Sequence, residues 1–272
     1  TTTILQPSSS ARHNIYVTDL VLRFATNSVV RVRSQNRNWT ITNCVIENSI
    51  TSHGLSLDCQ FFSLINSQVR SNGNSGSSHG MYLDTSGSGT ATNYVIKGCV
   101  IHDNSGDGIK INSGNVSRIE NIVLDGNTIF RNGNNGINNE AAERGRIVNN
   151  VIYDNGGTYD GWAINLSDNA GTFEARSNYI AHNTILHGRP GYAALRADTG
   201  SAGHTATNNI IECSGTAFYL EAGTSGAIES DFNNTTGNIA FRATFPNPQR
   251  LLRHGETGNI VMDSELKGVL LI

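Results

Sequence analysis

One short phrase recurs along most of the chain and limits the folds that are open to it. The phrase joins an apolar pair to two polar residues, an Asn or Ser, and a Gly-containing turn. Its second apolar residue recurs at intervals of 23, 32, 28, 23, 33 and 26 residues. That spacing is too variable for propeller blades, and the segments are too rich in strand-forming residues for helical repeats. The marker residues are Ile46, Val69, Ile101, Ile129, Ile152, Ile185 and Ile211.

A second phrase follows the first and is typical of a short strand. Examples are GLSLDC (54–59), GMYLDT (80–85) and GIKINS (108–113). Alternation with a period of two residues places the apolar side chains inside and the residues between them outside. This alternation predicts that Arg31, Ser56, Lys110 and Asn165 face solvent.

Together the two phrases predict an all-β chain that forms a single right-handed parallel β-helix of about eight to ten coils. Such a solenoid tolerates variable repeat lengths because insertions lie in turns on its outside. We expect one domain over residues 1–272. Residues 1–13 would form an N-terminal cap or lead-in, 14–241 the coils, and 242–272 a C-terminal cap or a truncated end.

Stacked coils would align equivalent residues in ladders, about 4.8 Å apart. Asparagine side chains in a ladder can bond one another and the turn backbone, so most asparagines are interpreted as scaffold. One predicted ladder contains Cys44, Ser67, Cys99, Asn127, Asn150, Asn183 and Asn209. A second contains Asn72, Asn104, Asn132 and Asn155.

The charge and the hydropathy of the chain exclude two classes of partner. Only 15% of the residues are charged and the formal net charge is −3, so a basic surface for nucleic acid is not expected. No apolar run reaches membrane-spanning length. The chain starts at Thr1 without a secretory signal, so we expect a removed signal or a piece of a longer protein. The expectation is a secreted or cell-surface protein that carries flanking domains.

Titratable side chains of different kinds gather on the outward positions of coils two to four. Registering the strands gives one column with Tyr82, Lys110 and Asn138, and a second with Asp58 and Asp84. A shorter column before the strands contains His53, His79 and Asp107. Each member also has a structural interpretation: the histidines precede Gly and can stabilise turns, and the aspartates can cap them. The convergence of these groups favours a functional site.

These repeats resemble the pectin-lyase-like β-helix superfamily of carbohydrate-binding and carbohydrate-cleaving proteins. The run His79-Gly80-Met81-Tyr82-Leu83-Asp84, followed by Asp107-Gly108-Ile109-Lys110, is similar in placement to the functional strands of mannuronan epimerases, with different residue identities. The resemblance implies a site on this face. By similarity to β-helix pectate lyases, Asp58, Asp84 and Asp107 are candidate calcium ligands, and calcium is the candidate cofactor.

The first hypothesis is a polysaccharide lyase or epimerase acting on a uronic-acid polymer. Elimination requires a base for the proton alpha to the carboxylate, an acid for the leaving oxygen, and a group that neutralises the carboxylate. We assign His79 as the base, Tyr82 as the acid, and Lys110 with Asn138 as the neutralising group. Asp84 would orient His79 or hold calcium with Asp58. His53, Asn138, Trp162 and Arg196 are the predicted sugar-binding residues.

Two alternatives stay open. Asp58 and Asp84 on neighbouring coils would lie about 5 Å apart, near the carboxylate separation of retaining glycoside hydrolases. The chain could also be a non-catalytic surface, adhesion or sugar-binding module, in which the solenoid is a spacer or a binding rod.

Overall fold

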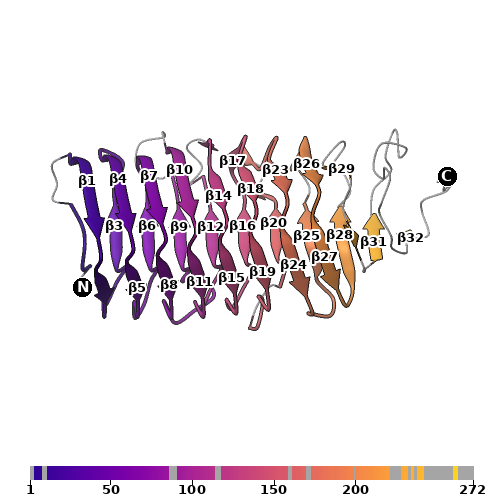
Figure 1. Ribbon diagram of the computed structural model, residues 1–272, viewed down its shortest axis with the longest axis horizontal. Coiled ribbons are helices and arrows are strands. Elements are labelled where there is room, and N and C mark those ends of the chain that lie inside the picture. Colours follow the sequence, from indigo (N-terminus) through magenta and orange to yellow (C-terminus); the bar gives the residue numbers. More distant parts are fainter. Residues whose placement is uncertain are drawn as a thin grey trace.

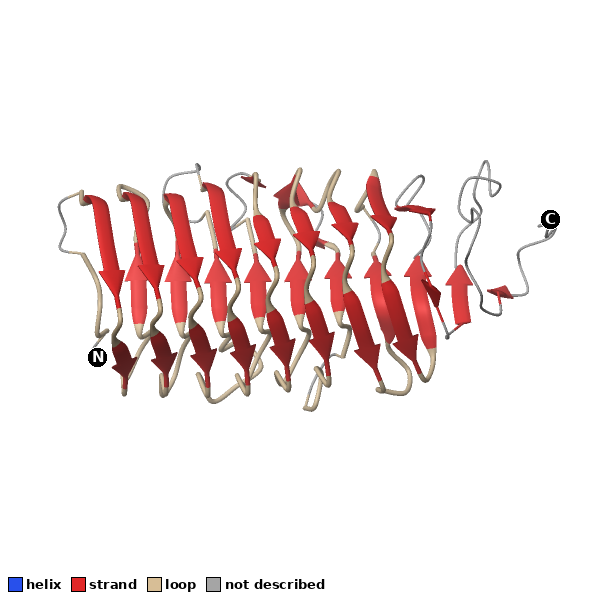
Figure 2. Ribbon diagram, viewed as in Figure 1, coloured by secondary structure: helices blue, strands red, loops and turns tan. Residues whose placement is uncertain are grey.

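The protein is a parallel β-helix whose coils stack along one axis (Figure 1). The computed structural model describes residues 3–7, 11–85, 91–113, 118–158, 161–169, 173–198 and 200–220, and short strands at 228–231, 234–235, 238–241 and 260–262. In these parts of the chain Figure 2 shows strands and loops only. The all-β prediction is confirmed. About seven turns are well formed, slightly fewer than the eight to ten predicted. The predicted 242–272 end lies almost entirely outside the described residues.

Each coil contributes one strand to each of three parallel sheets. Sheet 1 contains β1 (His13–Thr18), β4 (Arg37–Thr42), β7 (Gln60–Ile65), β10 (Thr92–Lys97), β14 (Val123–Asp125), β18 (Arg146–Val148), β23 (Tyr179–Ala181), β26 (His204–Thr207) and β29 (Ile228–Asp231), with β13 (Ile119–Glu120) and β17 (Ala142–Glu143) beside this path. Sheet 2 contains β2 (Val21–Arg23), β5 (Val45–Glu47), β8 (Gln68–Arg70), β11 (Val100–His102), β15 (Thr128–Phe130), β19 (Val151–Tyr153), β24 (Thr184–His187), β27 (Ile210–Cys213) and β30 (Asn234–Thr235).

Sheet 3 carries the residues that matter for the site. It contains β3 (Val30–Val32), β6 (Leu55–Leu57), β9 (Met81–Leu83), β12 (Ile109–Ile111), β16 (Ile137–Asn139), β20 (Ile164–Leu166), β25 (Ala193–Ala197), β28 (Thr216–Leu220), β31 (Asn238–Phe241) and β32 (Ile260–Met262). The strands β21 (Asp168–Asn169) and β22 (Phe173–Glu174) form a short antiparallel pair outside the three parallel sheets. Leu5 bridges Val30, so the N-terminal segment covers the first strand of sheet 3.

The apolar alternation fills the inside of the solenoid as predicted. The marker residues from Ile46 to Ile211 are buried, as are the inward pairs Leu55 and Leu57, and Ile109 and Ile111. Aliphatic side chains stack on their equivalents in the next coil and form one continuous core. The prediction for Asn165 is wrong: its side chain is 4% exposed, because its amide bonds Asn138 Oδ1 and Ser167 Oγ across the crowded face of sheet 3.

Both predicted ladders are present and hold the corners between sheets. In the first, Asn127, Asn150, Asn183 and Asn209 are linked, each side-chain oxygen accepting from the backbone and the amide of the preceding coil. The second links Asn72, Asn104, Asn132 and Asn155 in the same way. These bonds satisfy buried backbone groups at each bend, so the ladders specify where every coil turns.

A second class of asparagine serves the corners by its backbone. Asn43, Asn48, Asn66 and Asn149 adopt positive φ, and so do Asn14, Asn38, Asn93 and Asn121 in sheet 1 and its flanks. Asn tolerates this left-handed conformation better than other side chains do. The high Asn content therefore has two physical causes, of which the sequence pattern indicated only the ladders.

Candidate functional site

The outward face of sheet 3 has the predicted column order. Strand register aligns Arg31, Ser56, Tyr82, Lys110, Asn138, Asn165, Arg196 and Tyr219 on successive strands. Glycine fixes the strand that carries Tyr82: a Cβ at Gly80 would lie 2.7 Å from Asn104 Nδ2 and from the carbonyl oxygen of Gly108. The absence of a side chain at Gly80 therefore lets its backbone lie directly against Asn104 of the ladder, and this close contact fixes the positions of the neighbouring residues His79 and Met81.

A cavity of about 220 Å³ opens on this face over the first three strands of the sheet. Four predicted site residues line it: His53, Asp58, Tyr82 and Asp84. Arg31, Arg33 and Ser56 line it as well and had no predicted role. The sequence pattern predicts that these residues lie in the outward columns, but it does not predict that a cavity forms between them. The cavity lies nearer the N-terminus than the predicted centre at His79 and Lys110.

Three aromatic rings stack beside the cavity. His53 lies parallel to Tyr82, with ring centroids 4.6 Å apart, and parallel to His79 at 5.2 Å. His79 and Tyr82 are 5.7 Å apart, so His79 lies close to Tyr82 as predicted. His79, however, is only 6% exposed and is not among the residues that line the cavity.

The column before the strands is a hydrogen-bonded ladder in which histidine replaces asparagine. The backbone N–H of His79 donates to Nδ1 of His53 at 3.0 Å, and that of Asp107 donates to Nδ1 of His79 at 3.0 Å. One coil further, the N–H of Asn135 donates to Oδ1 of Asp107 in the same manner. An accepting Nδ1 assigns the proton of a neutral imidazole to Nε2. Both histidines are therefore donors, which is the opposite of the predicted role of His79 as a base.

Burial keeps these imidazoles neutral. Desolvation, followed by the charge of Arg31, lowers the pKa of His53 to about 4. Desolvation, followed by the charges of His53 and Lys110, lowers the pKa of His79 well below its ordinary value. His79 Nδ1 also lies 3.2 Å from Oδ2 of Asp107, but with a neutral ring this contact is not an ion pair at neutral pH. The backbone hydrogen bond to Nδ1 recurs along the column and leaves the ring proton on Nε2.

The Tyr82 side chain lines the cavity. Its hydroxyl oxygen accepts from Nδ2 of Asn112 at 2.6 Å, which leaves its own proton available to a ligand in the cavity. Burial raises the pKa of Tyr82, against the hydrogen bond from Asn112, and the nearby carboxylates of Asp84 and Glu140 raise it further. The phenol is therefore neutral at physiological pH, and its O–H can donate a hydrogen bond.

Lys110 and Asn138 are engaged inside the protein. Lys110 Nζ contacts the carboxylate of Glu140 in an ion pair. Asn138 is buried, and its oxygen accepts from Asn165 while its amide faces Asp107 Oδ2 at 3.5 Å. With Glu140 beside it, Lys110 carries a compensated charge, which does not fit the predicted role of neutralising a sugar carboxylate.

The three aspartates predicted as calcium ligands do not form one cluster. Asp58 and Asp84 line the cavity, whereas Asp107 lies beneath the face against His79 and Asn135. Desolvation raises the pKa of Asp107 to about 6, although Lys110 and three hydrogen bonds oppose this shift. Among the residues with a described position, no group of three or more His, Cys, Asp or Glu side chains could hold a metal ion.

Trp162 and Arg196 form a separate cluster further along the same face. The Arg196 guanidinium lies over the Trp162 ring, 4.4 Å from its centroid, and pairs with Asp198 at 2.9 Å. Tyr192 packs edge-on against Trp162 at 5.2 Å. Four strand spacings separate Arg196 from Tyr82, about 19 Å. A single sugar unit cannot contact both, so these residues would contact a distant part of a polymer.

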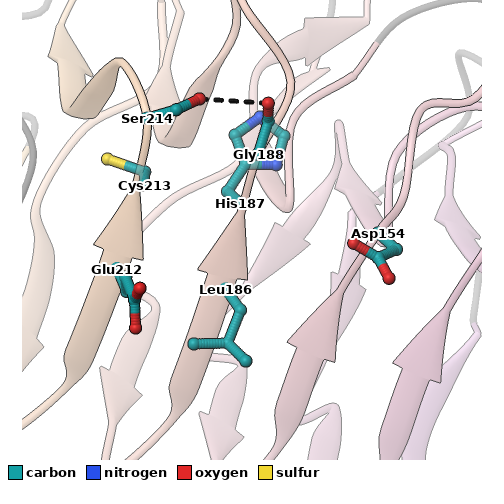
Figure 3. A pocket seen from close by; sticks show the side chains of 7 residues that line it. All are labelled: Asp154, Leu186, His187, Gly188, Glu212, Cys213 and Ser214. Carbon is teal, nitrogen blue, oxygen red and sulfur yellow. Dashed lines mark hydrogen bonds between the residues drawn. The ribbon is translucent and has the colours of Figure 1, made fainter.

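A second cavity, of about 410 Å³, lies on sheet 2 near Asn155, the last member of the second Asn ladder. Figure 3 shows the side chains that line it. Its lining includes Asp154, Glu212, and the register partners His187 and Cys213 of β24 and β27. Burial lowers the pKa of His187 to about 4, aided by Arg189, and raises the pKa of the Cys213 thiol. The thiol is therefore protonated and the imidazole neutral near pH 7.

Comparison with known proteins agrees with the architecture. Residues 28–242 match the family model described as a right-handed beta helix region. The chain belongs to this family. Among solved structures, the A-module of mannuronan C-5 epimerase AlgE6 from Azotobacter vinelandii matches with a TM-score of 0.58 and 16% sequence identity.

The alignment to that module covers 92% of this chain and 65% of the module, so this chain spans about two thirds of the module's length. At this identity the likeness shows the fold. No curated protein sequence matches the chain. The part of the β-helix that the structure describes contains no helix able to cross a membrane.

Proposed function

We propose that this β-helix protein removes the proton alpha to the carboxylate of a uronic-acid polysaccharide, as a lyase or an epimerase. The observation that carries the proposal is the composition of the 220 Å³ cavity. It brings together a neutral hydrogen-bond donor, His53, a neutral phenol, Tyr82, two carboxylates, and the cation of Arg31. Acid, base and positive charge are the three groups that this reaction requires.

In the proposed mechanism Asp84 is the base. Tyr82 and Asp84 are two residues apart near the end of β9, so their side chains leave the strand on the same face, about 7 Å apart along it. Asp84 is held by the backbone N–H of Thr85, which donates to its Oδ1 at 2.8 Å. Its carboxylate removes the C5 proton, and the electron pair is delocalised into the sugar carboxyl group.

Two outcomes follow from this intermediate. In elimination the electron pair forms the C4–C5 double bond, the glycosidic bond at C4 breaks, and the leaving oxygen takes the proton of Tyr82. In epimerisation Tyr82 gives its proton to C5 on the face opposite Asp84. Nε2–H of His53, stacked against Tyr82, is placed to donate to the charged carboxyl group in either case.

Kinetics of Tyr82→Phe test the proposal. The variant removes one hydroxyl and keeps the ring that stacks on His53, so the fold is expected to persist. We expect turnover of oligouronates to fall by at least roughly 100-fold, the usual contribution of a general acid. Tyr153→Phe is the matched control, because Tyr153 stacks on Phe130 on sheet 2 and lies outside the cavity. Equal activity of the two variants would contradict the role of Tyr82.

A retaining glycoside hydrolase is the second candidate. Asp58 and Asp84 both line the cavity and follow paired strands β6 and β9, whose spacing of about 4.8 Å approaches the separation of a retaining carboxylate pair. Hydrolysis would release reducing ends without an unsaturated product, and it would accept neutral sugars. Binding without any cleavage would favour the sugar-binding module, and loss of activity with chelator would support calcium.

A further inference from the structure

Arg31 differs from seven other arginines of the described residues in having no anionic partner. No carboxylate within the described parts of the chain forms an ion pair with it, and its guanidinium makes no hydrogen bond to a described side chain. The charge of Arg33 acts on Arg31 and is repulsive. In contrast, carboxylates pair with Arg23, Arg70, Arg118, Arg131, Arg144, Arg176 and Arg196.

Half-burial of an uncompensated cation is unfavourable in the free protein. Desolvation, followed by Arg33, lowers the pKa of Arg31, which reports the cost of holding this charge in the cavity. A ligand carboxylate would relieve that cost, and the planar guanidinium can bind it through two parallel N–H···O bonds. Arg33 lines the same cavity and adds a second positive charge.

Arg31, Ser56 and Tyr82 line one cavity and lie in one column of sheet 3. The column runs from Arg31 through Ser56 to Tyr82, a large, a small and a large side chain on successive strands. Two strand spacings, about 9.6 Å, separate the Cα atoms of Arg31 and Tyr82. The small Ser56 side chain between them forms part of the cavity wall.

We propose that Arg31 binds the carboxylate of the sugar unit that reacts, with the ring of that unit seated over Ser56 and facing Tyr82. This inference rests on the proposed function and replaces Lys110 as the neutralising group. It sets the substrate class: a polymer whose reacting unit is a uronate, oriented with its carboxylate toward the N-terminal end of the solenoid. A neutral sugar of the same ring geometry lacks the partner that Arg31 requires.

Calorimetric titration with tetramannuronate, tetragalacturonate and neutral mannotetraose tests the inference. We expect Arg31→Gln to weaken the binding of the preferred uronate by roughly 10- to 100-fold, the value of a charged hydrogen-bonded pair. Binding of mannotetraose is expected to be weak and unchanged by the substitution. Arg37→Gln is the matched control: Arg37 is exposed on sheet 1 and makes no ion pair with a described residue, and its loss changes the net charge equally.

A second variant tests the seat of the ring. Ser56→Phe would fill the hollow between Arg31 and Tyr82 with a residue that strands favour, and it is expected to abolish uronate binding while the urea midpoint stays near that of the wild type. Retained binding in Ser56→Phe, or equal affinities for Arg31→Gln and Arg37→Gln, would overturn the inference.

Turnover measured on the same samples separates this inference from the proposed function. Uronate binding that depends on Arg31, without any product, would support the carboxylate subsite and refute the enzyme. Turnover that survives in Arg31→Gln would support the enzyme and refute the subsite. Absence of uronate binding by the wild type would refute both.

Discussion

Substitution of Asn150 measures how much the buried ladder contributes to stability. Asn150 is 1% exposed and makes four side-chain hydrogen bonds. Its oxygen accepts from the backbone N–H and the amide of Asn127 at 2.9 and 3.0 Å, and its amide donates to Leu124 O and Asn183 Oδ1 at 2.9 and 3.0 Å. Leucine of similar volume cannot make these bonds.

Asn150→Leu leaves at least two buried donors of Asn127 without an acceptor. Each costs about 1–3 kcal/mol, so the free energy of unfolding is expected to fall by about 2–6 kcal/mol. The control is Asn74→Leu, because Asn74 is exposed in a turn and has a backbone conformation that leucine adopts. That change is expected to stay within about 0.5 kcal/mol. Urea melts with equal slopes provide the comparison. Equal midpoints for the two variants would refute the structural role of the ladder.

Three further predictions follow from buried or strained groups. Asp107→Asn should stabilise the protein at pH 7 by roughly 3 kcal/mol in urea melts, because a folded-state pKa of about 6 makes the charged form of Asp107 costly. The gain in stability should vanish near pH 4, where Asp107 is neutral in the folded protein. A gain that persists at pH 4 would contradict this cause. Phe61→Asn should stabilise the protein by about 1 kcal/mol. Phe61 is 48% exposed and has a φ of 55° in a column of asparagines, and asparagine adopts this left-handed conformation more readily than phenylalanine does. Destabilisation by this change would indicate that the ring of Phe61 makes a stabilising contact. The free energy of unfolding should fall as the pH drops below 6.5. Burial lowers the pKa of His53 and of His187 to about 4 and that of His204 to about 3, so the unfolded chain takes up protons first. A urea midpoint that is constant from pH 7 to 4.5 would contradict this linkage.

The fold could be predicted because its determinants are periodic. Inward aliphatic residues and ladder asparagines recur in every coil, and the burial of Ile101 or Asn132 follows from position in the repeat alone. The positive-φ corners were not predicted, because exposed Asn43 and buried Asn127 look alike in sequence.

The site was predicted only in part, because the sequence pattern gives the strand register but not the hydrogen bonds between coils. Columns depend on register, and register placed Tyr82 and Asp84 on one face. The protonation of His79 depends on a hydrogen bond from the backbone of the next coil, and the compensation of Lys110 depends on Glu140, which follows the neighbouring strand β16. Neither property is encoded in local sequence spacing. The hollow over Ser56 arises from the sizes of its neighbours on other coils, so it became visible only in three dimensions.

The fate of the C5 proton tests the central claim most directly. The wild-type protein is incubated in D₂O with tetramannuronate and with tetragalacturonate, and the products are analysed by NMR and by ultraviolet absorbance. The proposed chemistry predicts that one of these substrates either gains deuterium at C5 or gives an absorbing unsaturated product, and that Tyr82→Phe suppresses the change. Cleavage to saturated oligosaccharides that keep the original C5 proton would contradict it and assign the cavity to hydrolysis by Asp58 and Asp84.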